Sequence, residues 1–201
     1  DLGTTNSAIA YANIASAKRF GGRAVKTLAI PQLVARSEIG KADMLPSFLY
    51  IGSGAEFGQG TERPWHETDS HNDIVGRFAR EQGAKVTGRL VSSAKSWLSY
   101  DGVDRTAKIL PWGSKSERMY SPVGASAAYL HHLAAAWNDA FPKAPLQEQD
   151  VVLTVPASFD DVARTLTVDA AKSVGLTDNL VLLEEPQAAF YEYFRANSDE
   201  L

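Results

Sequence analysis

The sequence predicts an α/β fold built on a mixed sheet that helices flank. The β-branched runs Val151–Val155 and Leu180–Leu183 have the composition of buried parallel strands, and a helical pattern follows each of them. Nearer the N-terminus, residues 8–13 and 24–30 have the pattern of strands in a meander. A meander followed by alternating helices and strands favours a mixed sheet covered by helices.

The meander includes a first strand that is cut short at Asp1. We expect Gly21-Gly22 to form the turn between the strands at 8–13 and 24–30. We expect Pro31 to end the second of these strands, because proline cannot donate to a strand ladder. The sequence starts with aspartate instead of methionine, in the middle of this pattern, so we expect it to be part of a longer polypeptide.

Residues 33–114 change character, since their short apolar runs are broken by glycine, proline and serine. This change predicts an inserted small α+β subdomain at 33–114, with residues 1–32 and 115–201 forming the core subdomain. The elements expected in this part of the chain are a hairpin of 47–51 and 55–57 around Gly52-Ser53-Gly54, helices at 73–82 and 93–100, and short strands at 107–111 and 118–121.

A long helix is predicted at Pro122–Phe141, where apolar residues recur at three- and four-residue steps. His131-His132 lies on this helix, and adjacent helical residues point about 100° apart, so the pair cannot readily chelate one ion. We expect both to be surface histidines. His66 and His71 lack neighbours with metal-ligand spacing, and no role is assigned to them.

Two more helices surround the strand at 180–183. The helix at 158–174 is expected to begin with a capping box of Ser158 and Asp161 and to stop at Gly175. Its expected apolar face consists of Val162, Leu166, Ala170 and Val174. A last helix at 186–194 is expected to make its apolar contacts through Ala189, Phe190 and Tyr193.

The composition excludes several classes of protein. A net charge of −4 without a stripe of lysine and arginine argues against nucleic acid or an acidic membrane surface as the partner. The absence of cysteine rules out disulfides and thiolate metal sites, and fits a reducing compartment. No run of 18 apolar residues and no signal-peptide pattern is present, but a sequence that starts within a strand pattern does not reveal targeting. The expected location is the cytoplasm.

The first seven residues, Asp1–Ser7, combine a carboxylate, a glycine turn and a row of short polar side chains. Gly3 permits a tight turn whose N–H groups face an anion, and Thr4, Thr5 and Asn6 add donors nearby. Asp1 would face a magnesium ion, which takes only one or two carboxylates. The alternative is an ordinary hairpin whose tip is polar, since the stretch matches neither common glycine-rich phosphate motif.

Ligands of such sheets lie beyond the carboxyl ends of the strands, where Asp1, Pro156 and Glu185 would gather. Three separated stretches of the sequence resemble, in order and spacing, the nucleotide-binding domain of the heat-shock protein 70 (DnaK-type) chaperones. They are Asp1–Ser7, Thr154–Asp161 with Arg164 after it, and Glu185–Ala189. Shorter similarities occur at 45–47, 57–59 and 93–98, and the resemblance spans essentially the whole chain, weakly from about 60 to 120.

The resemblance implies an actin-like, ribonuclease-H-like lobe, which is one half of a two-lobed ATPase. It implies ATP or ADP with Mg²⁺ in the cleft between the lobes, and K⁺ as a candidate second ion. In the full-length protein it implies a chaperone of the stress response that binds unfolded client polypeptides and co-chaperones. The second lobe and the peptide-binding domain would follow after Leu201.

The resemblance also implies roles for single residues. Asp1 would hold magnesium through its water shell, Thr4 and Thr5 would contact the phosphates with Thr5 nearest the γ-phosphate, and Asn6 would support the loop. Lys95 would reach the γ-phosphate and the attacking water, although a lysine on a short helix is otherwise most often a surface charge.

Glu185 would act as the general base, with Glu184 as the neighbouring alternative and helix capping as the plain structural explanation. Alternation along the strand places only one of the two toward the cleft. Pro156 and Arg164 resemble a relay that reports nucleotide state to the peptide-binding domain. The chain departs from the family at Ser158, Val168 and Val181, so coupling to that domain is less well supported than nucleotide chemistry.

Two alternatives come from other functional classes: a small-molecule kinase of the same superfamily, and an interaction module that binds nucleotide without turnover. A kinase would transfer phosphate to a sugar or acid instead of water. We expect the isolated chain to bind nucleotide weakly and to hydrolyse it negligibly, since half of the phosphate contacts would come from the second lobe.

Overall fold

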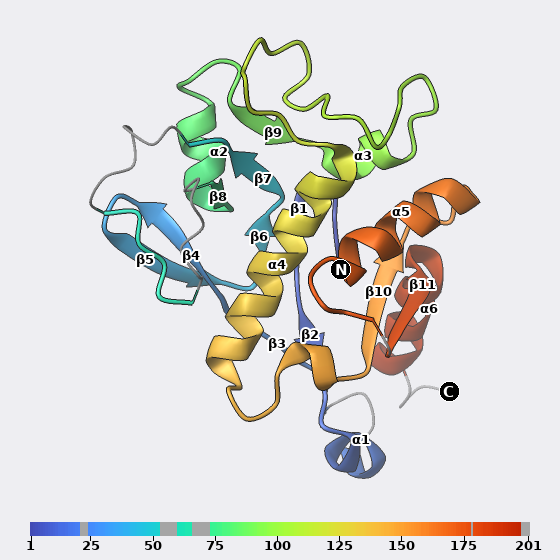
Figure 1. The fold of residues 1–201 in the computed structure, drawn as a ribbon. Helices are drawn as coiled ribbons and strands as arrows, with labels where there is room; N and C mark the ends of the chain where they lie inside the picture. Colours follow the sequence, from blue (N-terminus) through green and yellow to red (C-terminus); the bar gives the residue numbers. More distant parts are fainter. Residues whose placement is uncertain (21–23, 53–59, 66–72, 178, 198–201) are drawn as a thin grey trace.

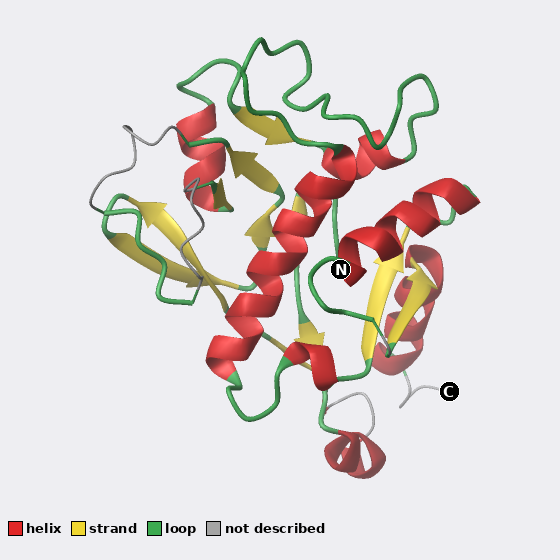
Figure 2. Cartoon of the chain, in the orientation of Figure 1, coloured by secondary structure: helices red, strands yellow, loops and turns green. Residues whose placement is uncertain are grey.

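A computed structural model describes residues 1–20, 24–52, 60–65, 73–177 and 179–197. The longest helix, α4 (Pro122–Ala140), runs between two groups of strands, as Figure 1 shows. One group comprises β4, β5 and β7 to β9, and the other comprises β10 and β11. The alternation of helices and strands in Figure 2 confirms the predicted α/β class.

The C-terminal half follows the sequence prediction closely. Strands β10 (Val151–Val155) and β11 (Leu180–Glu184) pair in parallel. Helix α5 (Asp161–Lys172) connects them, and α6 (Glu185–Ala196) follows β11 directly. A short 3-10 helix, η2 (Leu146–Glu148), lies ahead of β10.

The predicted start of α5 was wrong. Asp160, and not Ser158, is the N-cap residue, and its carboxylate accepts a hydrogen bond from the backbone nitrogen of Ala163 at 2.7 Å. The aspartate lies directly before the first helical turn, whereas Ser158 is still in the loop. Val162 was also placed wrongly on the buried face, since it lies in the first turn of α5 and is 55% exposed, whereas the buried face begins at Ala163.

The N-terminal strands are shorter than predicted. They are β1 (Asn6–Ser7), β2 (Ala10–Tyr11) and β3 (Lys26–Thr27), with an unpredicted helix α1 (Ile14–Phe20) between β2 and β3. The predicted turn at Gly21-Gly22 lies outside the described residues. β1 pairs with β6 (Leu45–Pro46), and β2 pairs with β3, both antiparallel.

Pro31 does not end a strand, which corrects the sequence prediction. It is the second residue of β4 (Ile30–Ala35), which pairs with β5 (Glu38–Ala42) in an antiparallel ladder. Among the described residues, β5 is the only strand hydrogen-bonded to β4, so β4 is an edge strand. An edge strand tolerates proline because one side of its backbone needs no ladder donor.

The central sheet has the strand order β8-β7-β9. Its members are β7 (Phe48–Tyr50), β8 (Ile74–Val75) and β9 (Leu90–Ser92). The predicted partner of β7 at 55–57 lies outside the described residues. The helix predicted from residue 73 starts later, as α2 (Arg77–Gly83), because Ile74 and Val75 pair with β7 and Gly76 (φ 100°) turns the chain. The expected strands at 107–111 and 118–121 are reduced to a bridge between Leu110 and Tyr120.

Among the residues that the structure describes, buried side chains form one large cluster and two smaller ones. The large cluster joins Leu2 with Leu130 and Leu133 of α4 and Leu153 of β10. A smaller cluster lies between β4, β7, β8 and α2, and another lies between α3 (Ala94–Leu98), β10 and α5. Leu2 and Leu153 belong to the same cluster, so apolar packing holds the first loop against β10. In the part of the chain that the structure describes, no helix is long and apolar enough to cross a membrane.

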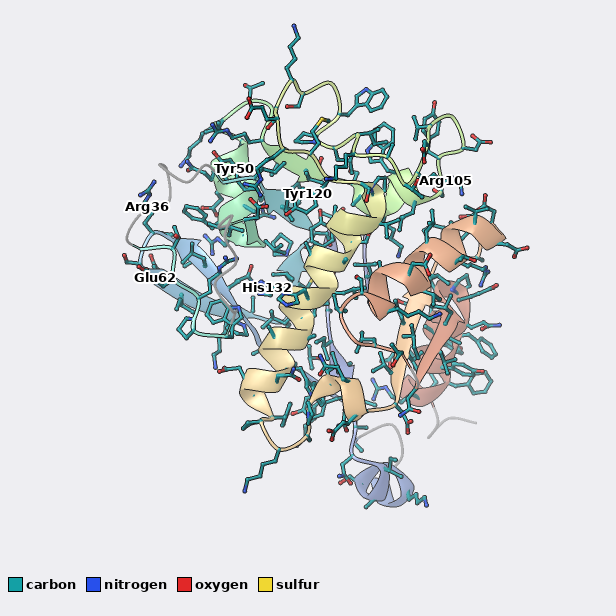
Figure 3. All side chains as sticks on the ribbon, viewed as in Figure 1. Arg36, Tyr50, Glu62, Arg105, Tyr120 and His132 are labelled. Carbon is teal, nitrogen blue, oxygen red and sulfur yellow. The ribbon has the colours of Figure 1, made fainter. Side chains whose placement is uncertain are left out.

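His132 is buried, which contradicts the prediction that both histidines lie on the surface. Its side chain is 1% exposed, and Nε2 lies 2.9 Å from the backbone oxygen of Pro31. Figure 3 shows His132 on the side of α4 that faces β4. His131 is exposed, since adjacent residues of a helix point in different directions.

The face of α6 that was expected to be apolar and buried is exposed. Phe190 and Tyr193 are 57% and 63% exposed, and Ala189 is also exposed. The strands below α6 are buried on one side only, since Val152 and Val181 are 55% and 60% exposed. The prediction that β10 and β11 are fully buried was therefore wrong. Helix α5 covers one face of the two strands, and the face that carries Val152 and Val181 is exposed.

Candidate functional site

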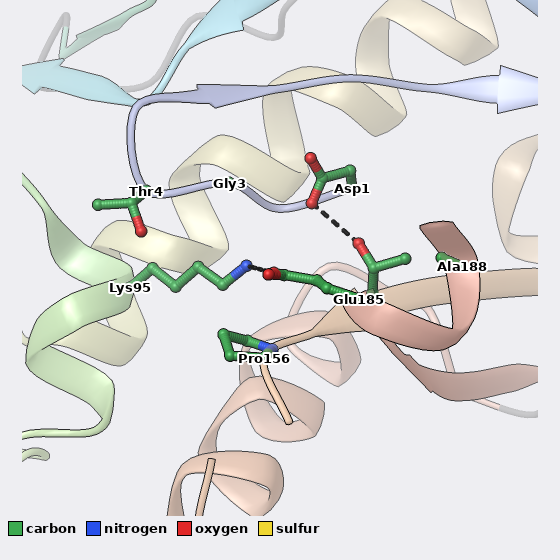
Figure 4. Close-up of a pocket in the computed structure, with 8 residues that line it drawn as sticks. Asp1, Gly3, Thr4, Lys95, Pro156, Glu185 and Ala188 are labelled. Carbon is green, nitrogen blue, oxygen red and sulfur yellow. Dashed lines mark hydrogen bonds and ion pairs between the residues drawn. The ribbon is translucent and has the colours of Figure 1, made fainter. Parts of the chain in front are cut away.

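A cavity of about 450 Å³ lies where the first loop, α3, the end of β10 and the start of α6 meet (Figure 4). Its lining is Asp1, Gly3, Thr4, Lys95, Thr154, Pro156, Glu185 and Ala188. Six of the sequence-predicted site residues are in this set: Asp1, Gly3, Thr4, Lys95, Pro156 and Glu185. They come from four separate segments, so the fold assembles the cavity.

The first loop is a hairpin closed by two backbone hydrogen bonds. The nitrogen of Asp1 donates to the oxygen of Ala8 at 2.8 Å, and the nitrogen of Ala8 donates to the oxygen of Asp1 at 3.0 Å. Burial lowers the pKa of the Asp1 α-amino group, and the charge of Lys95 adds to this effect. The two hydrogen bonds between Asp1 and Ala8 therefore hold the ends of the hairpin together.

Gly3 is required by close packing inside the hairpin. A Cβ atom at this position would lie 2.0 Å from the backbone oxygen of Asn6, far inside any real contact distance. Next to it, Leu2 is 2% exposed and anchors the loop in the large apolar cluster. Only a glycine lets the chain turn this tightly over a buried leucine.

The carboxylate of Asp1 is oriented by Thr154. The Thr154 hydroxyl donates to Asp1 Oδ1 at 2.8 Å, although the two residues are 153 positions apart (Figure 4). Sequence reasoning did not assign Thr154 a role. Its signal was a hydroxyl within an otherwise apolar strand, two residues before Pro156.

Lys95 and Glu185 form a hydrogen-bonded ion pair inside the cavity (Figure 4). The Lys95 side chain is 6% exposed and that of Glu185 is 43% exposed. Lys95 lies on α3, which begins after Ser93 in a left-handed conformation (φ 56°). Lys95 is therefore not a solvated surface charge, and its ammonium group faces the cavity.

Glu184 and Glu185 turn in different directions, as alternation along a strand predicts. Glu184 Oε1 accepts a hydrogen bond from the Arg164 guanidinium at 2.7 Å, outside the cavity lining. Arg164 Nε also donates to the backbone oxygen of Phe159 at 3.2 Å. Arg164 thus connects the loop after β10 to the end of β11.

Two residues assigned to the phosphate loop do not line the cavity: Thr5, which was predicted to contact the phosphates, and Asn6, which was predicted to support the loop. Thr5 is exposed at the hairpin tip, and its backbone oxygen accepts a hydrogen bond from Ser47 at 2.8 Å. Asn6 belongs to β1 and lies opposite Pro46. The structure therefore brings Gly3 and Thr4 to the cavity and leaves Thr5 and Asn6 beside it.

A bidentate ion pair supports the loop after Pro156. Arg105 Nη1 donates to Asp160 Oδ1 at 2.9 Å, and Nη2 donates to Oδ2 at 3.0 Å. The Arg105 hydrogen bond holds the pKa of the Asp160 carboxyl below its usual range, and the backbone bond from Ala163 adds to this. Asp160 thus joins the segment after α3 to the first turn of α5.

The donor set fits an anion together with a weakly chelated cation. The cavity offers one ammonium group from Lys95, the hydroxyl of Thr4 and the carboxylates of Asp1 and Glu185. No group of three or more acidic, histidine or cysteine side chains occurs among the described residues in a metal-binding arrangement. Magnesium needs no such cage, because it keeps several waters and takes one or two carboxylates.

Comparisons with known proteins identify the family of this chain. The family model described as "Hsp70 protein" matches residues 42–199. A "Chaperone protein HscA homolog" from Aromatoleum aromaticum is 35% identical over 204 residues, which covers all of this chain and 28% of that relative. "Chaperone protein HscA" from Salmonella paratyphi C is 35% identical over 132 residues, covering 59% of this chain and 21% of the relative.

The chain thus spans between a quarter and a third of the length of the Aromatoleum relative. The family match covers well over half of the chain and includes α3 with Lys95, the loop with Pro156, and α6 with Glu185. On this evidence the chain belongs to the Hsp70 family.

Proposed function

We propose that this chain is the first lobe of the ATP-binding domain of a divergent, DnaK-like chaperone, and that its cavity binds the phosphates of ATP or ADP with Mg²⁺. The observation that carries the proposal is the convergence of Asp1, Lys95 and Glu185 on one cavity. Hydrolysis of a phosphoanhydride requires neutralised charge and a positioned water more than covalent chemistry. A carboxylate, an ammonium group and a second carboxylate around one space meet that requirement.

The first hairpin supplies the phosphate and metal contacts. Asp1, oriented by Thr154, would hold a magnesium ion through its water shell, and that ion would supply neutralisation of the phosphate charge. Thr4 lines the cavity, and its hydroxyl donates a hydrogen bond to a phosphate oxygen. Thr5 approaches the γ-phosphate from the exposed hairpin tip, with Asn6 behind it.

Lys95 and Glu185 carry the chemical step. A phosphate oxygen competes with Glu185 for the Lys95 ammonium group, since both are anionic acceptors. Lys95 then stabilises the charge that develops on the γ-phosphate, and Glu185 orients the attacking water and accepts its proton. The ion pair holds both groups at the cavity before nucleotide arrives.

We propose that the chain is divided into a core subdomain of residues 1–32 and 115–201 and an inserted subdomain of residues 33–114. The cluster of Leu33, Tyr50, Ile74, Phe78 and Ala79 supports this division, because it is formed entirely by residues of the inserted part. Lys95 belongs to the inserted subdomain and Glu185 to the core, so the catalytic pair bridges the two.

In the full-length protein, ATP turnover is coupled to the binding of client polypeptides, with co-chaperones as further partners, in the stress response of the cytoplasm. A second lobe completes the nucleotide site and K⁺ is a candidate second ion. Pro156 and Arg164 act as the relay to the peptide-binding domain. The contacts of Arg164 to Glu184 and to Phe159 support this role, since they join the loop after β10 to the end of β11.

ATP hydrolysis by the full-length protein tests the proposal. Wild-type protein releases phosphate to water, and Lys95→Ala and Glu185→Ala each reduce single-turnover hydrolysis by at least about 100-fold. Ser158→Ala, at an exposed position outside the cavity, is the matched control and retains wild-type turnover. Unchanged turnover in both cavity variants would eliminate the site assignment, and transfer of phosphate to a sugar or acid would identify a kinase instead.

A further inference from the structure

Three ion pairs connect the segments that surround the candidate site. Their members are Lys95 with Glu185, Glu184 with Arg164, and Asp160 with Arg105. The first pair joins α3 to the start of α6, the second joins the end of β11 to α5, and the third joins the start of α5 to the segment that follows α3. Each segment contributes to two pairs, so the three pairs, here called the ion-pair circuit, form a closed ring.

Arg105 is held in the ion-pair circuit by a fork of hydrogen bonds. Its Nη1 atom donates to both carboxylate oxygens of Asp160, at 2.9 and 3.0 Å, and Nη2 donates to Oδ2 at 3.0 Å. Nε donates to the backbone oxygen of Tyr100 at 3.2 Å. The Arg105 side chain is 10% exposed, and Figure 3 shows it where the loop after α3 approaches α5. Paired bonds from a planar guanidinium fix the orientation of a carboxylate, so Arg105 ties Tyr100 to Asp160.

Helix α3 depends on contacts outside itself for its position. It has five residues, fewer than an isolated helix needs to be stable in water. Leu98, its last residue, is fully buried in a cluster with Val155 and Phe159. Two residues later, the backbone accepts the hydrogen bond from Arg105. Lys95 lies one turn before Leu98, so these two anchors determine where its ammonium group lies.

The ion-pair circuit opens at one point if nucleotide binds as proposed. A phosphate oxygen then takes the place of Glu185 at the Lys95 ammonium group. In that state α3 loses its ion pair to α6, whereas the Arg105–Asp160 pair still joins the segment after α3 to α5. The position of Lys95 relative to the γ-phosphate then depends on the Arg105 side of the ring.

We propose that Arg105 is a positioning residue for the reaction at the candidate site: through Asp160 it holds α3, and with it Lys95, against the segment that follows β10. This inference rests on the proposed function, because the position of Lys95 matters only if Lys95 acts on the γ-phosphate. A misplacement of about 1 Å can slow a chemical step about 100-fold. Arg105 therefore affects the chemical step more than the binding of ADP, which has no γ-phosphate.

A purely structural role of the Arg105–Asp160 pair makes a different prediction. The Asp160 side chain is 51% exposed, and partly exposed ion pairs contribute little to the free energy of unfolding. A structural role would lower the melting temperature slightly and leave the rate per folded molecule unchanged. A positioning role lowers that rate in protein that remains folded. Substitution of Arg105 separates the two roles, because it leaves the hydrogen bond from Ala163 that caps α5 in place.

The test measures single-turnover ATP hydrolysis by the full-length protein at saturating ATP, well below the melting temperature of each variant. Arg105→Gln is expected to reduce the rate at least about tenfold, while the dissociation constant for ADP changes less than about twofold. Arg105→Lys keeps the charge but loses the fork, so we expect an intermediate rate. The matched control is Arg77→Gln, which removes an arginine from the exposed Arg77–Glu81 pair of α2 and is expected to retain the wild-type rate.

A double-mutant cycle shows whether Arg105 acts through Asp160. Asp160→Asn keeps a capping oxygen and removes the charged partner, so we expect a reduction in rate similar to that of Arg105→Gln. The double variant is expected to be no more than about twofold slower than the slower single variant, since both changes break the same pair. Effects that multiply in the double variant would overturn the proposal, because the two residues would then act separately.

The chemical labelling of lysine amines measures the position of Lys95 independently of turnover. In nucleotide-free full-length protein, the wild-type Lys95 side chain is 6% exposed and is expected to react slowly. Arg105→Gln is expected to speed its labelling at least about threefold, as mass spectrometry of the peptide measures. If wild-type protein did not hydrolyse ATP, the proposed function would fail, and the labelling alone would decide the inference about Arg105. Unchanged labelling of Lys95 or unchanged hydrolysis in Arg105→Gln would overturn the inference.

Discussion

Lys95 of α3 and Glu185 at the start of α6 form an ion pair across the candidate site, although 90 residues separate them in the sequence. The pair lies in the cavity that the first hairpin and Pro156 also line. Lys95 is nearly buried, so its ammonium group has few alternative partners. The ion pair therefore fixes both groups in the cavity, and under the proposed function a bound phosphate competes with Glu185 for Lys95.

The first prediction concerns the free energy of unfolding when this pair is broken. Glu185→Ala leaves the buried Lys95 ammonium group without its hydrogen-bond acceptor, which costs about 1–3 kcal/mol. Lys95→Met removes the charge but retains much of the apolar stem, so the loss is expected to be smaller. Urea unfolding of both variants measures the difference. A larger loss for Lys95→Met than for Glu185→Ala would contradict this view of the pair.

The second prediction concerns the turn at Gly3. Gly3→Ala places a Cβ atom 2.0 Å from the Asn6 oxygen, so the hairpin must open. We expect a loss of about 1–3 kcal/mol in the free energy of unfolding, the range typical of overpacking in a confined space. Gly124→Ala on α4 is the control, since its nearest atom would be Ser121 Oγ at 3.2 Å, and alanine favours the helix. Calorimetry that finds equal melting temperatures for wild type and Gly3→Ala would show that the hairpin is not so confined.

The third prediction concerns the Arg164–Glu184 pair. Both side chains are partly exposed, at 29% and 36%, so each single charge reversal is expected to cost only about 1 kcal/mol or less. The double variant Arg164→Glu with Glu184→Arg restores the ion pair, and we expect it to recover part of that loss. A double-mutant cycle measured by chemical denaturation gives the coupling free energy. A coupling of zero would mean that the pair does not connect α5 to the end of β11 energetically.

The fourth prediction concerns the dependence of stability on pH. Arg105 lowers the pKa of Asp160 in the folded protein from the ordinary value of 3.8. As pH falls, the unfolded chain therefore takes up this proton first, and the stability contributed by Asp160 is present above pH 3.8 and lost as pH falls through the folded pKa.

Asp160→Asn tests this dependence, because asparagine keeps the helix-capping oxygen but cannot titrate. The difference in melting temperature between wild type and Asp160→Asn is expected to be largest near pH 6 and to shrink below pH 3.8. A difference that stays constant from pH 6 to pH 2.5 would rule out the Arg105–Asp160 pair as its source.

The elements that the sequence predicted well are those defined by their own periodicity. Helix α4 follows a three- and four-residue apolar repeat, and β10 and β11 are uninterrupted β-branched runs. Pro31 was misjudged because a strand edge tolerates proline, and which strand lies at an edge is a property of the whole sheet. Ile74 and Val75 were assigned to a helix because two residues carry too little pattern to reveal their pairing with β7.

The sequence by itself determined the α/β class, the family resemblance and the segments that carry the candidate site, since these depend on residue types and on short-range spacing. Only the tertiary structure decided which side chains meet: Thr154 with Asp1, Arg164 with Glu184, and His132 with the backbone of Pro31. Partners of this kind lie tens to more than a hundred residues apart. Their contact depends on how helices and strands pack around the shared apolar clusters, which no local pattern records.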